Sequence, residues 1–458
     1  MVNESLTING LHKGWTIQRI GDFAKVKGGK RLPTGAALTN KRTDHPYIRI
    51  VDFSDGRINR SNLMYVPNDV FPRISRYTIS ANDVWISIVG TVGLTGLVDE
   101  ALDGASLTEN AAKICSIASY VDKVFLSLFL RSEQGREQIR SQTVGSTQPK
   151  LALFRIEDIR VPVPPLPEQR RIAHILGTLD DKIENNRKTA KTLEAMAQAI
   201  FKSWFVDFDP VRAKMAGESR ESICKRLKLT PEILDLFPDR LVDSELGDIP
   251  EGWEVRSLDS IGNFLNGLAM QKFPSSGQDN PLPVIKIAQL RACDLSGADL
   301  ASNEIEPQFI VHDGDILFSW SGSLECVLWS GGIGALNQHL FKVTPKAGHP
   351  RWLCYYGIHH FLEFFREVAA GKATTMGHIQ RHHLSDARLA LPHLKILHGI
   401  NESVEVAFEI MWKDLVEARK LSVIRDILLP KLISGEIRVS DAHAVVDTNA
   451  STSKPFHD

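Results

Sequence analysis

The sequence lacks the features that mark several large classes of protein. Its five cysteines have no paired spacing, which excludes a disulfide framework or a zinc knuckle and is typical of reduced thiols. No run of about 18 apolar residues occurs, and the first 15 residues hold no apolar stretch of the signal-peptide type. We therefore expect a soluble, cytoplasmic protein that has no membrane segment.

Charge of one sign is not in excess either. Lys and Arg together number 54 against 55 Asp and Glu, which gives a net charge of −1. No global basic field therefore indicates a nucleic-acid partner, although a basic patch can be offset by acidic surface elsewhere. A chain of 458 residues predicts about two to four domains.

Motifs that carry catalysis are also absent. GKATT (371–375) lacks the first glycine of a phosphate-binding loop, and GGIGALN (331–337) holds only a fragment of a dinucleotide fingerprint. No Asn-Pro-Pro-aromatic tetrapeptide of the methyltransferase kind occurs, and DFDP (207–210) is interpreted as a helix stop. HIQRHH (378–383) spaces two histidines by four residues but lacks the glutamate of a zinc protease, which favours a solvated or nucleic-acid-facing cluster. The sequence therefore predicts no catalytic residue and no metal site.

The chain does contain a long amphipathic stretch, from Pro167 to Phe205. Its core-type positions follow one another in alternate steps of four and three residues, which is the spacing of a heptad seam. A helix over the 33 residues of this seam (204−172+1) would be about 50 Å long. The seam positions are Ile172, Leu176, Leu179, Ile183, Asn186, Ala190, Leu193, Ala197, Ile200 and Trp204.

The same seam recurs 228 residues later (400−172), and its one polar position, Asn186, falls on polar Asp414. Any two long amphipathic helices share heptads, but the shared interruption favours an internal repeat. The second seam consists of Ile400, Val404, Ala407, Met411, Asp414, Ala418, Leu421, Arg425, Leu428 and Leu432.

Segments outside the helices repeat as well. Gly14-Trp15 corresponds to Gly252-Trp253, and the paired segments are rich in short strand-like runs broken by Gly, Asp, Asn and Pro. Other matches are NDVWISIVGT (82–91) with GDILFSWSGS (314–323), SLTENAAKI (106–114) with ALNQHLFKV (335–343), and TVGSTQPKL (143–151) with GKATTMGHI (371–379).

These patterns predict an α+β fold. Two strand-rich α/β domains would be separated by two long antiparallel helices, a coiled-coil spacer, in a pseudo-twofold internal repeat. The expected segments are a first domain (1–165), a first spacer helix (166–207), a connector (208–250), a second domain (251–393), a second spacer helix (394–438) and a disordered tail (439–458).

The antiparallel arrangement is expected because the first helix delivers the chain to its far end, and the second must return to bury the same seam. Ile172 should then lie nearer Leu432 than Ile400, and Ile200 nearer Val404 than Leu432. Asn186 and Asp414 should come within about two helical turns of each other and fix the register.

Polar and basic residues recur in the same loops of both domains. Taken singly, each is more typical of an ordinary solvated face, but Lys and Arg suit phosphates, and Gln and Arg can read base edges. The predicted DNA-binding residues are Lys27, Lys30, Arg31, Thr91, Ser146, Thr147, Gln148 and Lys150 in the first domain, and Gln271, Lys272, Ser321, Ser323, Thr374, Thr375, His378 and Arg381 in the second.

Four segments carry a resemblance that covers essentially the whole chain. They are residues 165–210 with their WFVDFDP ending, the Gly-Trp pair that opens each half, GSTQPKL (145–151), and LLPKLISGEIRV (428–439). With these segments the sequence resembles the specificity subunit of a Type I restriction–modification enzyme.

The resemblance implies two target-recognition domains, each of which recognises one half of a split DNA site. The helices would set the gap and dock two methyltransferase subunits, and two restriction subunits would complete the assembly. S-adenosylmethionine, ATP and Mg would belong to these partner chains, with no cofactor in this one. Candidate docking residues are Glu168, Gln169, Arg170, Trp204 and Phe205.

The second half departs from the pattern, because KILHGINES (395–403) replaces PEQRRIAHI (167–175). Docking by the two halves therefore need not be symmetric. The alternatives are a methyltransferase–specificity fusion or a stand-alone nuclease, which would need a cofactor or metal motif, and a purely structural coiled coil, which would not need two domains with polar loops.

Overall fold

The computed structural model describes residues 14–54, 56–145, 149–275, 280–346, 348–371 and 377–439. The chain divides into two compact units. Unit 1 contains the described residues up to Lys182 together with those from Leu421 onward, and unit 2 is Ile183–Lys420. Each long helix therefore belongs partly to one unit and partly to the other. All of the predicted tail except Val439 lies outside the described residues.

A four-stranded antiparallel sheet forms the centre of unit 1. Its strand order is β2 (Lys25–Gly28), β10 (Ala111–Cys115), β7 (Val84–Ser87) and β8 (Thr95–Leu97). The sheet packs against an apolar helix, α2 (Lys123–Arg131), in which every residue from Phe125 to Leu130 is buried. The alternation of apolar and polar residues thus favours the strands, and the apolar run that follows them in the sequence forms the helix that covers the sheet.

The helical pattern of residues 121–142 in the sequence forms two helices, α2 (Lys123–Arg131) and α3 (Glu133–Gln142). Ser132 separates them in an extended conformation, and its hydroxyl group accepts a hydrogen bond from the Gly135 amide. A serine that caps the second helix therefore interrupts a pattern that the sequence presents as continuous.

Smaller elements complete unit 1. The strand-like run at residues 47–53 is broken after Ile48, because the Asp52 carboxylate accepts from the Arg49 amide at 2.8 Å and closes a 3₁₀ turn. The remaining elements are β1 (Thr16–Arg19) paired with β11 (Arg160–Val163), α1 (Ile20–Phe23), α4 (Leu153–Glu157), the hairpin β4 (Phe53–Ser54) with β5 (Arg57–Ile58), and the sheet of β6 (Met64–Tyr65), β3 (Pro46–Ile48) and β9 (Ser106–Leu107).

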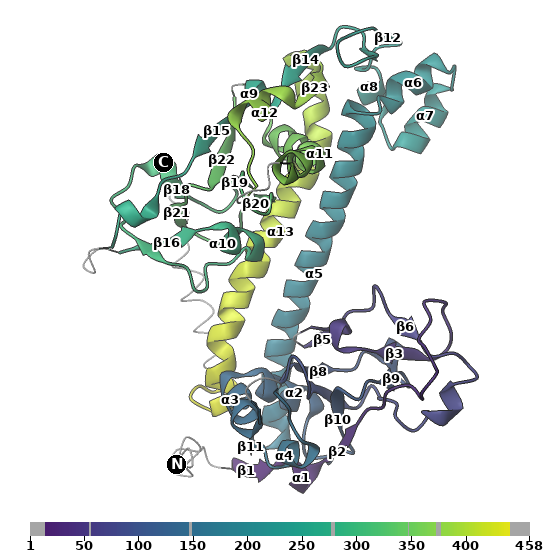
Figure 1. Ribbon diagram of the computed structural model, residues 1–458, viewed down its shortest axis with the longest axis vertical. Helices are drawn as coiled ribbons and strands as arrows, with labels where there is room; N and C mark the ends of the chain where they lie inside the picture. Colours follow the sequence, from purple (N-terminus) through teal and green to yellow (C-terminus); the bar gives the residue numbers. More distant parts are fainter. Residues whose placement is uncertain are drawn as a thin grey trace. The chain divides into compact units, whose positions relative to one another are not determined.

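Unit 2 repeats the same frame. Its four-stranded antiparallel sheet has the order β15 (Gly262–Asn266), β22 (Leu340–Pro345), β19 (Ile316–Ser319) and β20 (Cys326–Leu328). One helix, α11 (Arg351–Ala370), covers this sheet. Strand order and covering helix are thus the same in both units (Figure 1), as the sequence repeat predicts.

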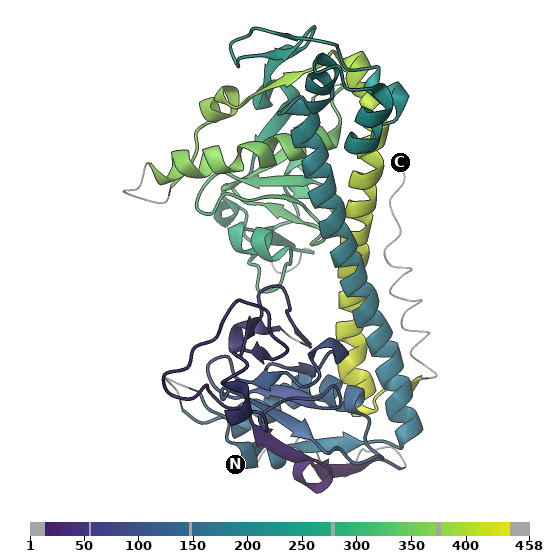
Figure 2. The same ribbon diagram turned by 90° about the vertical axis from the view of Figure 1, so that its right-hand side faces the viewer.

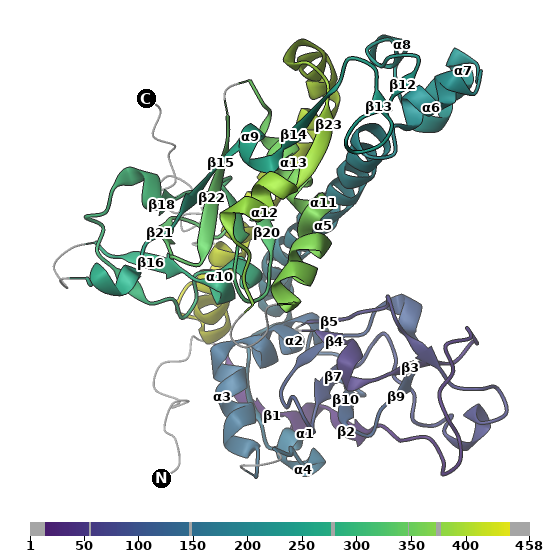
Figure 3. The same ribbon diagram turned by 45° about the horizontal axis from the view of Figure 1, so that its top comes forward.

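A second sheet of unit 2 lies beside β15 and β22 (Figure 3). It has the order β17 (Leu300–Ala301), β16 (Leu282–Ile285), β21 (Gly334–Leu336) and β18 (Ile310–Val311). Further elements are β14 (Glu254–Ser257) paired with β23 (Arg388–Leu391), α9 (Leu258–Ile261), α10 (Ile287–Ala292) and α12 (Arg381–Asp386).

The two long helices are α5 (Leu166–Phe205) and α13 (Leu394–Ser434), and they lie side by side (Figures 1 and 2). In unit 1, Ile172 shares a buried cluster with Leu428 and Leu432. In unit 2, Ile200 packs on the cluster that contains Ile400 and Val404. The antiparallel prediction is therefore confirmed within each unit.

The polar seam residue Asn186 forms its hydrogen bond one turn away from Asp414. Its side-chain amide donates to the Glu417 carboxylate at 2.7 Å, and Glu417 lies three residues beyond Asp414 on α13. Asn186 is buried, whereas Glu417 is exposed, so the longer Glu side chain reaches back to the seam from its edge. Asp414 lies about one turn from Glu417 on the same helix, so Asn186 and Asp414 lie within the predicted two turns, and a polar pair marks the register.

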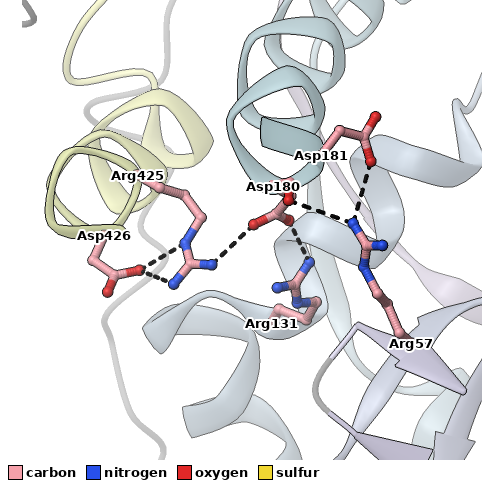
Figure 4. Close-up of polar contacts among 6 residues, drawn as sticks. All are labelled: Arg57, Arg131, Asp180, Asp181, Arg425 and Asp426. Atoms are coloured by element: carbon pink, nitrogen blue, oxygen red, sulfur yellow. Dashed lines mark hydrogen bonds and ion pairs between the residues drawn. The ribbon is translucent and has the colours of Figure 1, made fainter. Parts of the chain in front are cut away.

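An ion cluster joins the first domain to both helices in unit 1 (Figure 4). Asp180 on α5 accepts from Arg131 of α2 and from Arg425 of α13, each at 2.9 Å. Beside it, Arg57 of the β4–β5 hairpin contacts exposed Asp181 at 3.2 Å. Burial of the Asp180 carboxyl group raises its pKa, but the two guanidinium groups outweigh burial and bring the pKa below its ordinary value of 3.8.

Aromatic side chains replace this ion cluster in unit 2. Phe408 of α13 packs against Tyr355 and Tyr356 of α11, with ring centroids 5.6 and 6.0 Å apart. The Tyr355 hydroxyl group donates to Glu194 of α5 at 2.6 Å. Burial lowers the pKa of neighbouring His359 despite the charge of Glu194.

The connector contains more helix than the sequence predicts. Helix α5 ends at Phe205, Phe208 adopts a left-handed conformation (φ 55°), and Pro210 lies in the first turn of α6 (Asp209–Met215). Pro210 therefore begins a helix instead of stopping one, a position that suits its missing N–H. Two further helices, α7 (Arg220–Leu227) and α8 (Pro231–Leu234), precede the short strands β12 (Leu241–Val242) and β13 (Ile249–Pro250).

Among the residues described above, no helix combines the length and apolar character needed to cross a membrane.

Candidate nucleic-acid interface

Four loops meet at one end of the unit 1 sheet. The first loop follows β2, the second precedes β10, the third joins β7 to β8, and the fourth contains Lys150. Lys150 forms bridges with both Val89 and Val144, and the Leu151 amide donates to the Ile88 carbonyl at 3.0 Å. Loops that are far apart in the sequence are thus fastened to one another by backbone hydrogen bonds.

Basic side chains gather at this end of unit 1. Lys27, Lys30, Arg31 and Lys150 are exposed, and so is Thr91 in the turn between β7 and β8. A surface of this kind suits contacts with phosphates.

Arg31 has one fixed partner, Glu109. Its Nε donates to the Glu109 carboxylate at 3.1 Å, while the Arg31 side chain is 77% exposed. Because the carboxylate holds Nε, the guanidinium group is oriented and still faces solvent. An oriented Arg is suited to bidentate contact with guanine or with a phosphate.

The corresponding end of unit 2 has an aromatic and polar surface. The indole N–H of Trp320 donates to the Asn266 side-chain oxygen at 2.8 Å, and the Trp320 ring packs against His339 and His378. The loop around His378 is held by a bridge between Ser321 and His378. This bridge corresponds to the one between Val89 and Lys150 in unit 1.

The two ends are built on one backbone frame. The Gly29 amide donates to the Ala111 carbonyl, and the Gly267 amide donates to the Leu340 carbonyl, both at 3.0 Å. Neither glycine could carry a side chain, because a Cβ atom would lie about 2 Å from a backbone carbonyl oxygen. Equivalent loops therefore carry different polar side chains on the same frame, an arrangement that suits two recognition surfaces of different specificity.

Comparison with known proteins identifies this repeated frame. The family described as Type I restriction modification DNA specificity domain matches residues 12–195 and 250–405. The chain belongs to this family. It is a specificity subunit of a Type I restriction–modification system, and its two matches are the two target-recognition domains.

Related proteins cover nearly the whole specificity subunit. It is 26% identical to the Type I restriction enzyme HindI specificity subunit of Haemophilus influenzae, over 92% of this chain and 97% of that protein. It is 25% identical to the MjaIX specificity subunit of Methanocaldococcus jannaschii, over 95% of this chain and 96% of that protein. The crystal structure of the S subunit from M. genitalium shares its fold, with a TM-score of 0.55 at 15% identity over 93% of this chain and 98% of that one.

The predicted DNA-binding residues of the specificity subunit fall into four groups. Lys27, Lys30, Arg31, Thr91 and Lys150 come together at one end of unit 1, as described above. Ser321, Ser323, His378 and Arg381 come together in unit 2, where Arg381 donates to the Phe264 carbonyl at 3.3 Å. Gln271 and Lys272 are exposed in a 3₁₀ turn (Met270–Lys272), whereas Ser146, Thr147, Gln148, Thr374 and Thr375 lie outside the described residues.

One of these predictions needs correction. Ser321 is only 3% exposed, and its hydroxyl group lies 3.1 Å from Nδ1 of His339. Its side chain is therefore used inside the specificity subunit, where it supports a neighbouring residue. The other predicted contacts with DNA stay predictions.

Sequence reasoning missed five residues of these surfaces: Glu109, Asn266, Trp320, Gln338 and His339. The signal that could have found two of them was present, because aligning SLTENAAKI (106–114) with ALNQHLFKV (335–343) places Gln338 opposite Glu109 and His339 opposite Asn110.

The candidate docking residues of the specificity subunit also separate. Gln169 is fully buried, and its amide group bonds to the Asp122 amide and to the carbonyls of Tyr120 and Pro164. Trp204 and Phe205 are buried in the core of unit 2. These three predictions are corrected, because the side chains are used inside the molecule.

The remaining two docking candidates are accessible. Glu168 is partly exposed and accepts a hydrogen bond from the Trp15 indole at 3.2 Å. Arg170 is exposed, and it lines a recess of about 430 Å³ together with Asn82, Asp122, Lys123 and the loop 116–119.

Proposed function

We propose that this specificity subunit binds double-stranded DNA and that each of its two domains recognises one half of a bipartite site. Helices α5 and α13 would set the gap between the half-sites and dock two methyltransferase subunits. The observation that carries the proposal is the repeated sheet end, on which equivalent loops carry cations in one domain and aromatic and amide groups in the other.

We also propose that the chain is not itself an enzyme. Catalysis would belong to the two methyltransferase and two restriction subunits, which would bind S-adenosylmethionine, ATP and Mg. The sequence supports this division of labour, because none of its motifs has the residues and spacing of a cofactor or nucleotide site. The assembly would act in the cytoplasm.

The test is to map methylated adenines in DNA from cells that produce the chain together with its partner subunits. A split sequence with a fixed gap is expected. Replacing residues 1–165 with the corresponding domain of another specificity subunit should change one half of the sequence and leave the other half and the gap unchanged.

A continuous recognition sequence would contradict the proposal, as would a domain exchange that alters both halves. The purified chain alone, supplied with S-adenosylmethionine, should not methylate DNA. Methylation by the isolated chain would overturn the proposed division of labour.

A further inference from the structure

Gln338 occupies a fixed position at the end of the unit 2 sheet. It lies in the loop between β21 and β22, and its side chain is half-buried. Its backbone carbonyl accepts from the Trp320 indole at 3.2 Å, and the neighbouring His339 amide donates to the Asn337 side-chain oxygen at 3.3 Å. Asn337 is itself buried, so the loop that carries Gln338 is held in one conformation.

Two successive side-chain contacts, from Ser321 to His339 and from His339 to Gln338, then orient the Gln338 amide group. The Ser321 hydroxyl group lies 3.1 Å from Nδ1 of His339, and Nε2 of Gln338 lies 3.3 Å from Nε2 of the same ring. An amide nitrogen can only donate, so Nε2 of His339 is the acceptor in this contact. The imidazole is then neutral with its proton on Nδ1, where it donates to buried Ser321.

This arrangement uses one of the two N–H groups of Gln338. The second N–H group and the carbonyl oxygen Oε1 stay together on one planar amide. In the major groove, adenine offers an N6–H donor beside the N7 acceptor, and a Gln side chain binds both with its oxygen and its N–H. A guanine at the same place offers two acceptors and would leave Oε1 without a donor.

We propose that Gln338 is a base-reading residue of the second domain, that it specifies adenine, and that His339 and Ser321 are the positioning residues that orient it. The proposal rests on the proposed function, because it requires this sheet end to face the major groove.

The first domain supports this assignment by contrast. Glu109 occupies the position of Gln338, Asn110 that of His339, and Val89 that of Ser321, as the matched bridges and loops indicate. The Ser–His–Gln contacts therefore have no counterpart in the first domain, where Glu109 binds Arg31 instead. Adenine reading through this position is expected only in the half-site of the second domain.

The experiment is selection of bound sequences from a random duplex library by the full-length chain, produced together with its partner subunits. Gln338→Ala should lower the preference for adenine at one position by about 5- to 150-fold, the range that one bidentate contact provides. Gln338→Glu should shift the preference at that position towards cytosine, whose N4–H group a carboxylate accepts. Gln308→Ala is the matched control, because Gln308 is an exposed glutamine of the same unit, in the 3₁₀ turn Pro307–Phe309.

The positioning residues are tested by double mutants. His339→Ala and Ser321→Ala should relax the same position and no other. In the Gln338→Ala background, His339→Ala should cause no further loss there, because the residue acts through Gln338. Loss of preference across the whole half-site, or an additive loss in the double mutant, would assign His339 a purely structural role and overturn this part.

The outcomes separate the two proposals. If the wild-type chain selects no split sequence, the proposed function fails, and this inference fails with it. If the wild type selects a split sequence and Gln338→Ala keeps every base preference, only the inference is overturned. Relaxation confined to one adenine of one half-site supports both.

Discussion

A glycine lies against a neighbouring backbone at the end of each four-stranded sheet. A Cβ atom on Gly29 would lie 2.1 Å from the Thr108 carbonyl oxygen, and one on Gly267 would lie 2.2 Å from that of Asn337. We expect Gly29→Ala to destabilise the protein by about 1–3 kcal/mol, because the loop must move to admit the methyl group.

The matched control for this substitution is Gly177→Ala in helix α5, where a Cβ atom would meet nothing within 4 Å. That change should stabilise the protein by about 0.5–1 kcal/mol, since alanine has the higher helix propensity. Denaturant unfolding of both variants gives the two values. A Gly29→Ala protein as stable as the wild type would show that the loop is not confined as described.

Exposed cations of the first domain should contribute to DNA affinity without regard to sequence. Lys150→Ala removes one such charge, and we expect binding to weaken equally for specific and non-specific duplexes. The slope of log K against log salt should fall in magnitude by about 0.9 for each phosphate contact that is lost. Lys191→Ala, an exposed lysine on α5, is the control, and an unchanged slope for Lys150→Ala would remove Lys150 from the interface.

At the scale of single residues, loop polarity that recurs in both halves pointed to the loops at the ends of the two sheets, whose contact with DNA stays a prediction. It could not tell accessible residues from supporting ones. Ser321 and Gln169 are polar and lie in the predicted segments, but their side chains are buried on internal partners. Which partner a polar group has depends on loops far away in the chain, and local patterns do not contain that information.

Among the helices, two neighbouring carboxylates of α5 have different environments. Asp180 binds two arginines, and its side chain is 16% exposed, whereas Asp181 binds Arg57 and is 76% exposed. We expect Asp180→Asn to destabilise the protein by about 1.5–3 kcal/mol, the range for hydrogen bonds to charged groups. Asp181→Asn should cost about 0–1 kcal/mol, as exposed ion pairs do.

This difference should depend on pH. The folded-state pKa of Asp180 is lowered, so its contribution is fully present above the unfolded pKa of about 3.9 and is lost as pH falls through the folded pKa. The gap in stability between wild type and Asp180→Asn should therefore be constant near neutral pH and should narrow below about pH 4. If the difference in stability between wild type and Asp180→Asn grew as the pH fell, the ion cluster would be contradicted.

Elements with a long regular period were predicted well from the sequence. The heptad seams of α5 and α13 are buried or half-buried, and their antiparallel pairing follows from the order of the segments. Short elements were predicted less well, because one residue decides each of them. Ser132 divides a helical pattern by capping its second half, and Pro210 lies in the first turn of α6, directly after the left-handed Phe208 cap and Asp209.

For the molecule as a whole, the two halves share a frame but join their helices by different chemistry. With an offset of 228 residues, Arg131 corresponds to His359, Asp180 to Phe408, and Arg425 to Ala197. At these positions unit 1 has an ion cluster and unit 2 has packed aromatic rings, although ion pairs such as Arg419–Asp313 also join α13 to the second domain. The repeat predicts that the domains share a fold, but not that either domain can replace the other.

A chimera that carries residues 251–393 in place of residues 14–165 tests this difference. It would place His359 where Arg131 stands, so Asp180 would keep only one of its two guanidinium partners. We expect a loss of about 1.5–3 kcal/mol in the free energy of unfolding relative to the parent. His359→Arg, made only in the transplanted copy, should recover most of it by restoring the missing cation.

A second rescue changes the helices instead of the domain. Asp180→Phe together with Arg425→Ala gives the chimera the residues that unit 2 has at these positions, and it should also recover stability. The same double substitution in the parent chain leaves Arg131 without its carboxylate and should destabilise it. Calorimetry of the five proteins tests this. A chimera as stable as the parent without either rescue would show that the domains are interchangeable and that the ion cluster does not discriminate between them.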